Sequence, residues 1–134
     1  MSKLLKNSLF LFGVLVICAI NYDVRAEDLD LTGLLLQAEQ GEIQAQLQLG
    51  LMYANGKQVE QSFADAQLWW SKAAEQGSDQ AKFFIGYMYS KGAGVEQDKL
   101  KAKHLWEQAA ANDNLPALFN LGLFYTEGEG GEGS

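Results

Sequence analysis

Glycines recur near the end of the chain in a spacing that binds phosphates in nucleotide-binding proteins. The segment from Gly128 to Gly133 reads GEGGEG and matches the pattern G-x-G-x-x-G. In dinucleotide-binding folds such a loop follows a strand and opens a helix, whose N-terminus stabilises the pyrophosphate. No strand-like segment precedes these glycines, no helix can follow them, and two glutamates would repel phosphate. We therefore predict a flexible Gly/Glu tail over residues 129–134 and no nucleotide or other cofactor site.

The single histidine, His104, can serve as an acid, a base or a metal ligand near neutral pH. The sequence has no second histidine and no cysteine near His104. The patterns H-E-x-x-H and G-x-S-x-G and the calcium-binding loop do not occur. The carboxylates are dispersed over positions that repeated helix surfaces and caps explain. We therefore predict a structural histidine, no metal site, no catalytic residues and a protein that is not an enzyme.

The charge of the chain excludes further classes of partner. The 134 residues include 10 lysines and arginines and 17 aspartates and glutamates, which gives a formal charge of −7. A nucleic-acid-binding protein needs a cationic face that displaces counterions from phosphates, and anionic lipid surfaces attract basic segments. We expect a protein or peptide as the partner, no nucleic acid, and no membrane contact by the mature form. The length predicts one small domain.

The first 26 residues have the arrangement of a cleavable secretory signal peptide. Lys3 and Lys6 precede an almost uninterrupted apolar run over residues 9–20. Twelve helical residues span roughly 18 Å, which is less than the roughly 30 Å hydrocarbon core of a membrane. Residues of small or modest size precede Glu27, so we predict cleavage after Ala26 and a periplasmic or secreted bacterial protein.

Cys18 lies within this predicted signal peptide and is the only cysteine. A lipid-attachment cysteine follows a small residue, whereas Ile17 precedes Cys18, so we interpret it as an apolar residue of the signal. Removal of residues 1–26 leaves 108 residues without cysteine and with a formal charge of −9. Such a domain depends on its hydrophobic core, because no disulfide can stabilise it.

Residues 38–128 repeat with a period of 36 residues. Residues 38–73 and 74–109 are identical at 16 of 36 positions. Self-similarity at this period indicates a solenoid of stacked helical hairpins. The same offset aligns small and aromatic residues three times without a gap: Ala45/Ala81/Ala117, Gly50/Gly86/Gly122, Tyr53/Tyr89/Tyr125 and Gly56/Gly92/Gly128.

Each complete repeat has the apolar spacing of two short helices. Apolar residues of the first helix recur at i, i+4, i+7 and i+8, as from Ala45 to Tyr53. Gly56 and Gly92 are placed to end the first helices, and Ser62 and Asp98 to cap the second helices. The inner face of the second helix carries alanines and one tryptophan: Ala66, Trp70, Ala73 and Ala74, then Ala102, Trp106, Ala109 and Ala110.

A glycine lies inside each first helix, at Gly50, Gly86 and Gly122, where glycine costs about 1 kcal/mol relative to alanine. A close approach between helices would offset this cost, because a position without a side chain can receive a large one. We predict that the tryptophan of the neighbouring second helix fills this space.

The repeat has a defined signature, A-x-x-x-L/I-G-x-M-Y-x-x-G-x-x-V-E-Q followed by A-x-x-x-W-x-x-A-A-x-x-G. This signature closely resembles the Sel-one-like repeat, a relative of the tetratricopeptide repeat with a slightly longer unit. The second unit matches at nearly every signature position. The first has Lys57-Gln58 in place of a second turn glycine and Ser62 in place of aspartate, departures that could alter the turn and leave the fold unchanged.

We therefore predict an all-α fold, an α/α solenoid of helical hairpins with about two and a half repeats and six short helices. The domain covers residues 27–128 after the signal peptide at 1–26. Its predicted parts are an N-terminal capping helix at 27–41, repeats at 42–77 and 78–113, and a partial repeat at 114–128 with only its first helix.

Residues that vary where the scaffold repeats are the candidates for partner contact. Positions at i, i+4, i+7 and i+11 of each first helix form one stripe, and the resemblance implies that first helices line the concave surface. The alternative is that the apolar members Phe84, Tyr87 and Leu123 pack between repeats. The predicted protein-binding residues are Gln44, Gln48, Leu51, Asn55, Gln80, Phe84, Tyr87, Lys91, Asn120 and Leu123.

The partial repeat predicts an exposed edge. A following second helix would cover the face that carries Leu121, Phe124 and Tyr125, so we expect part of this apolar surface to be exposed. Solenoids normally end in a polar cap, because such exposure is unfavourable. We expect this edge to form a homodimer or to receive a partner helix that completes the repeat.

The leading functional hypothesis is a non-enzymatic scaffold or adaptor that binds another protein in the periplasm. The resemblance also allows an immunity protein that neutralises an exported toxin, a role that some periplasmic relatives are thought to play. A hydrolase of cell-wall or β-lactam substrates is the third alternative. Relatives of that kind have a cysteine-rich architecture, which the predicted mature chain lacks.

Overall fold

The computed structural model describes residues 26–128, and these residues form six α-helices and no strand. The predicted all-α fold is therefore confirmed. Residues 1–25 and 129–134, with most of the predicted signal peptide, Cys18 and the predicted Gly/Glu tail, lie outside the described part. The helices are α2 (Ala26–Glu39), α3 (Ile43–Asn55), α4 (Phe63–Glu75), α5 (Asp79–Lys91), α6 (Lys99–Ala110) and α7 (Leu115–Thr126).

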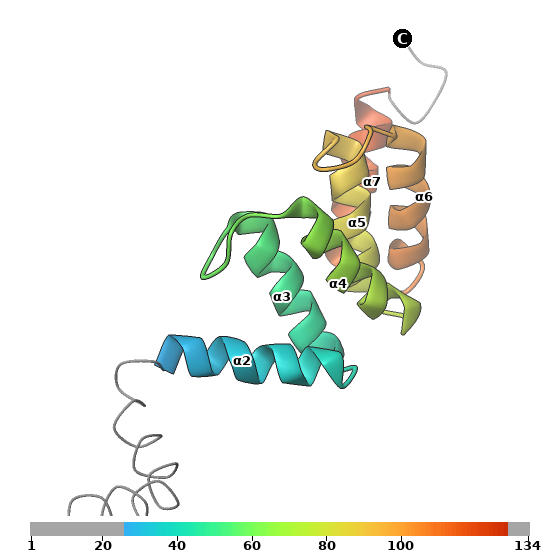
Figure 1. Ribbon diagram of the computed structural model, residues 1–134. Coiled ribbons are helices and arrows are strands. Elements are labelled where there is room, and N and C mark those ends of the chain that lie inside the picture. The colour runs from blue at the N-terminus through green and yellow to red at the C-terminus, as the bar shows by residue number, and fades with distance from the viewer. Residues whose placement is uncertain (1–25, 129–134) are drawn as a thin grey trace, which may run out of the picture.

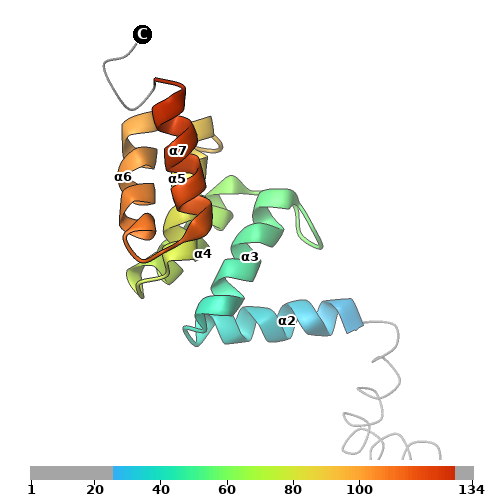
Figure 2. The same cartoon turned by 180° about the vertical axis from the view of Figure 1, so that it is seen from behind.

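The helices form hairpins that stack from α2 at one end to α7 at the other (Figure 1). α3 pairs with α4 and α5 with α6, and each helix packs mainly on the helices that precede and follow it in the chain. Seen from behind, α7 lies in front of α5, and α3 also faces the viewer (Figure 2). Within residues 26–128, none of the helices combines the length and the apolar character that crossing a lipid bilayer requires.

Left-handed backbone conformations shape the turns after the first helices. Gly56 follows α3 and Gly92 follows α5, with φ of 66° and 67°, where a residue without Cβ has no steric penalty. Two residues later, Gln58 adopts the same left-handed conformation as its counterpart Gly94, with φ of 63° and 69°. The departure at Lys57-Gln58 therefore does not alter the turn.

Polar side chains cap α4 and α6 at the predicted positions. Ser62 caps α4 and Asp98 caps α6, each by accepting a hydrogen bond from the backbone N–H group three residues later, at 3.2 and 2.9 Å. Ser78 caps α5 and Asn114 caps α7 in the same way. These caps define where α4, α5, α6 and α7 begin, whereas Glu42 before α3 makes no side-chain cap.

Tryptophans of the second helices occupy the space that glycines of the first helices leave. A Cβ atom at Gly86 would lie 2.6 Å from Nε1 of Trp106, and one at Gly50 would lie closer still to Trp70. Both tryptophans are 4% exposed. The predicted packing of Gly50 and Gly86 is therefore confirmed. Each indole N–H also donates a hydrogen bond to a first-helix carbonyl, that of Leu47 at 3.2 Å or Phe83 at 3.1 Å.

α7 ends the described stack and leaves apolar side chains uncovered. Tyr125 is 51% exposed and Leu121 is half-buried. Phe124 is only 5% exposed, because it takes the place in α7 that Met52 and Met88 take in α3 and α5, facing the core. The expectation that Phe124 belongs to the exposed edge is therefore wrong.

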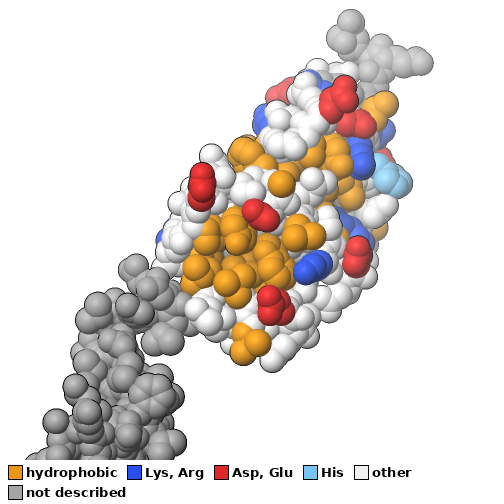
Figure 3. Space-filling view, in the orientation of Figure 1, with side chains coloured by type: hydrophobic (Ala, Val, Ile, Leu, Met, Phe, Trp, Pro, Cys, Tyr) orange, Lys and Arg blue, Asp and Glu red, His pale blue; other side chains and the backbone are white. Residues whose placement is uncertain are grey.

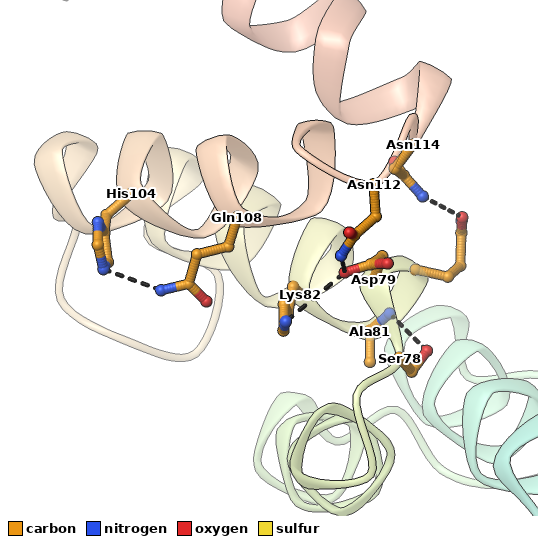
Figure 4. A network of polar contacts seen from close by, with 9 residues as sticks. Ser78, Asp79, Ala81, Lys82, His104, Gln108, Asn112 and Asn114 are labelled. Atoms are coloured by element: carbon orange, nitrogen blue, oxygen red, sulfur yellow. Dashed lines mark hydrogen bonds and ion pairs between the residues drawn. The ribbon is translucent and has the colours of Figure 1, made fainter.

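Side-chain hydrogen bonds join the loops that connect the hairpins. Asn112, after α6, donates to Asp79 of α5 at 3.1 Å, and Asn114 donates to Gln80 at 3.2 Å (Figure 4). Gln76, the counterpart of Asn112 one repeat earlier, donates to the backbone of the loop before α3 at 2.9 Å. These contacts set the spacing between neighbouring hairpins.

Candidate protein-binding surface

Five of the ten predicted contact residues line one hollow between α3 and α5. This hollow has a volume of about 530 Å³. Phe84 stacks on Trp70 of α4 with ring centroids 4.8 Å apart, so two aromatic rings from successive hairpins contribute to its wall. The predicted residues in this hollow are Leu51, Asn55, Phe84, Tyr87 and Lys91.

Two further hollows adjoin the first one along the first helices. A hollow of about 350 Å³ between α5 and α7 shares Tyr87 and Lys91 with it. A hollow of about 280 Å³ along α3 shares Leu51 and Asn55 with it. Because these residues each line two hollows, the three hollows adjoin one another, and we call them together the first-helix groove. Its predicted members are Gln48, Leu51, Asn55, Phe84, Tyr87, Lys91, Asn120 and Leu123.

The other two predicted residues lie outside this groove. Gln44 is exposed near the start of α3, and Gln80 is half-buried at the start of α5, where its side-chain oxygen accepts the hydrogen bond from Asn114. Neither lines any of the three hollows. Gln80 therefore joins neighbouring hairpins in this structure.

Three large apolar side chains of the groove are open to solvent. Leu51 is 39% exposed, Tyr87 is 48% exposed and Leu123 is 43% exposed. Phe84 is half-buried against Trp70, so it packs between repeats, as the alternative interpretation expected. The face on which α4 lies in front also carries a broad patch of apolar side chains, with single acidic and basic side chains at its border (Figure 3). Exposed apolar side chains such as those of the groove can anchor a partner.

The groove is basic although the chain is acidic. Lys57, Lys91 and Lys99 line it, and Glu127 is the one carboxylate among the lining residues described. Over the complete sequence, acidic residues outnumber basic ones by 17 to 10. Lys91 also lies beside the exposed aromatic anchor, with Nζ 6.0 Å from the ring centroid of Tyr87. The groove therefore combines apolar surface with positive charge.

Two polar contacts of α6, at His104 and Lys101, lie outside this groove. His104 is exposed, and its Nε2 atom lies 2.9 Å from Nε2 of Gln108 (Figure 4). The pKa of Lys101 is raised, first because the Tyr89 hydroxyl accepts its hydrogen bond at 3.0 Å and then through the Coulombic effect of Tyr89. Among residues 31–128, whose side chains the structure describes, no group of three or more His, Cys, Asp or Glu side chains could hold a metal ion.

Some lining residues of the groove were missed by the sequence analysis. Phe63 of α4 and Ala93 of the loop after α5 line the hollow between α3 and α5, although neither belongs to a first helix. Gln61 also lines it, and its side chain donates to the carbonyl of Ala54 at 2.8 Å. The repeated Val-Glu-Gln segment was a signal for this contact, since Gln97 makes the same hydrogen bond one repeat later.

Comparison with protein families identifies the repeat. The Sel1 repeat matches residues 43–78, 79–114 and 115–133. The chain therefore belongs to the Sel1 repeat family, and the predicted resemblance is confirmed. Sel1 repeat proteins generally mediate protein–protein interaction.

The solved structures that are similar to this chain include two other proteins with this fold. A Sel1 repeat protein from Oxalobacter formigenes is 35% identical, with a TM-score of 0.65 and coverage of 74% of this chain and 74% of that chain. The second is c5321, a protective antigen present in uropathogenic Escherichia coli strains and displaying an SLR fold. It is 39% identical, with a TM-score of 0.70 over 73% of this chain and 21% of its own. Comparison with curated proteins gave no match.

Proposed function

We propose that this chain is an exported scaffold that binds a partner protein in the first-helix groove. The observation that carries this proposal is the row of three adjoining hollows along α3, α5 and α7. A binding scaffold needs a complementary shape and a few apolar anchors, which Leu51, Tyr87 and Leu123 provide. Sel1 repeat scaffolds are generally non-catalytic, which also supports binding in preference to the hydrolase alternative.

The charge of the groove supports a partner segment that combines apolar and acidic side chains. An apolar partner side chain enters the hollow between α3 and α5, which Phe84 and Tyr87 line. A carboxylate beside it pairs with Lys91, the basic residue common to two hollows. Because the lysines are solvent-accessible, this pairing adds mainly to the association rate and weakens as salt rises.

Site-specific photocrosslinking tests the groove directly. A photoreactive amino acid at position 87 is expected to form a covalent adduct with the partner in cells of the source organism. The matched control is position 108, because Gln108 is exposed on α6 and lines none of the three hollows. Lys91→Glu should reduce the adduct at position 87. Adducts of equal yield at both positions would contradict the groove as the binding surface.

Export is a separate part of the proposal, and it rests on the leader from Lys3 to Ala26. Mass spectrometry of the mature protein should find Glu27 as the first residue. A matched variant with Leu11→Arg in the apolar run should remain unprocessed, because a charge there interrupts the segment that a signal peptide requires. A wild-type protein that keeps residues 1–26 in a membrane fraction would contradict cleavage.

A further inference from the structure

Each complete repeat contains a slot that a tryptophan fills. In the first repeat, the indole of Trp70 lies on Gly50 and donates its N–H to the carbonyl of Leu47 at 3.2 Å. In the second repeat, Trp106 lies on Gly86 and donates to the carbonyl three residues before that glycine at 3.1 Å. A helical glycine and the carbonyl one turn before it therefore form a binding site for one indole, and this site occurs twice.

The third repeat has the same slot, and no described residue covers it. Gly122 is the counterpart of Gly50 and Gly86, and nothing outside its own helix lies within 4 Å of the position that a Cβ atom would take. The counterpart of the two accepting carbonyls is that of Phe119. Half of the ten exposed large apolar side chains described lie on this one helix: Leu115, Leu118, Phe119, Leu123 and Tyr125.

We propose that the open slot at Gly122 binds the tryptophan of a helix from a partner protein, which then completes the third repeat. The two filled slots define the occupant. In both slots, two alanines flank the tryptophan on its helix, one four residues before it and one three residues after it. These alanines are 0% exposed, so they lie at the contact between helices: Ala66 and Ala73, then Ala102 and Ala109. The partner helix therefore carries the pattern Ala-x-x-x-Trp-x-x-Ala, and its indole N–H donates to Phe119. Small residues at these positions allow the close approach that an indole on a glycine requires.

A second copy of the chain fits this slot less well. Its tryptophans, Trp69, Trp70 and Trp106, are 7%, 4% and 4% exposed, so a copy could supply an indole only by opening one of its own repeats. The excess of acidic residues also opposes self-association. A helix from another protein supplies the indole without either penalty.

The second helix of this chain is a suitable probe for the slot. A peptide with the sequence of residues 98–113 carries Trp106 and both flanking alanines. Isolated helices of this length are marginally stable in water, so a hydrocarbon staple should join positions 100 and 104, which are exposed on α6. The matched control peptide carries Trp106→Ala. Fluorescence anisotropy of labelled peptide then measures binding to the chain.

The stapled peptide should bind the wild-type chain. The control peptide should bind with an affinity that is lower by about tenfold or more, because it lacks the aromatic side chain that anchors the helix. Gly122→Leu should lower the affinity for the stapled peptide to a similar degree by filling the slot. Gly33→Leu is the matched control in α2, because Gly33 also has nothing within 4 Å of a built Cβ. It should leave binding unchanged, and urea unfolding checks that both variants are folded.

Three results would overturn the proposal: no binding to the wild-type chain, equal binding of the control peptide, or unchanged binding to Gly122→Leu. Unchanged binding to Gly122→Leu would mean that the peptide binds elsewhere, for example in the place of α6 on Gly86. A dimer of the wild-type chain that Gly122→Leu dissociates in sedimentation would assign the slot to a second copy and overturn the partner helix. Tyr87→Ala in the first-helix groove should leave peptide binding unchanged, so this test and the photocrosslinking test can fail independently.

Discussion

Gly50→Ala is expected to destabilise the protein, although alanine is the better helix former by about 1 kcal/mol. The added Cβ atom would overlap the indole ring of Trp70. The ring cannot move away freely, because it donates a hydrogen bond to Leu47 and stacks on Phe84. Overpacking of this kind costs about 1 to 3 kcal/mol, which exceeds the gain in helix propensity. The urea midpoint of the variant should therefore fall.

The repeat itself supplies the control for this substitution. Gly122→Ala changes the same position of the third repeat, where nothing lies within 4 Å of the new atom, so the urea midpoint should stay unchanged or rise. Gly86→Ala and Gly86→Leu should lower it, because Trp106 lies 2.6 Å from the built Cβ. If Gly50→Ala and Gly122→Ala shifted the midpoint equally, the packing of tryptophan on glycine would not be the reason for the repeated glycine.

Trp70→Ala should cause the largest loss of stability among single substitutions in the second helices. Trp70 is 4% exposed, and it contacts its own hairpin through Gly50 and the next hairpin through Phe84. Removing a buried aromatic side chain costs about 3 to 5 kcal/mol, since it loses apolar burial and leaves a cavity. The free energy of unfolding from urea titration, followed by circular dichroism, measures this loss.

Trp106→Ala is the matched control for Trp70→Ala. Both tryptophans are 4% exposed and donate similar hydrogen bonds, but the counterpart of Phe84 one repeat later is Asn120, which cannot stack as a ring. Aromatic pairing contributes about 0.5 to 1.5 kcal/mol beyond burial, so Trp70→Ala should exceed Trp106→Ala by about that amount. If Trp70→Ala lost less free energy of unfolding than Trp106→Ala, the contact between hairpins would contribute little to stability.

The sequence by itself determined the helices, their ends and the hairpin repeat. These features depend on interactions between residues close in the chain, such as the cap at Asp98 and the left-handed ends at Gly56 and Gly92. Because the repeats are similar to one another, a feature identified in one repeat predicts its counterpart in the next. The self-similarity also predicted a long-range contact that recurs, that of Trp70 and Trp106 with their glycines. Signal-peptide cleavage after Ala26 stays a prediction.

Only the tertiary structure decided how much of each predicted contact residue is exposed. Phe84 and Tyr87 occupy adjacent positions of one stripe, yet Phe84 is half-buried on Trp70 and Tyr87 is 48% exposed. The difference depends on how one hairpin sits on the next, and helical spacing within a single repeat does not contain this information. Phe124 was assigned to the exposed edge for the same reason, and its burial follows from the position of α6.

The buried polar residue Gln46 was likewise visible only in the folded chain. It is 3% exposed, donates to the carbonyl of Ala38 at 3.0 Å, and accepts from Gln76 at 3.0 Å. A buried amide is stable only when such partners satisfy it, and these two partners lie 8 and 30 residues away in the chain. The spacing of residues along the chain specifies the hairpins, whereas the stacking of α2, α3 and α4 brings these three residues together.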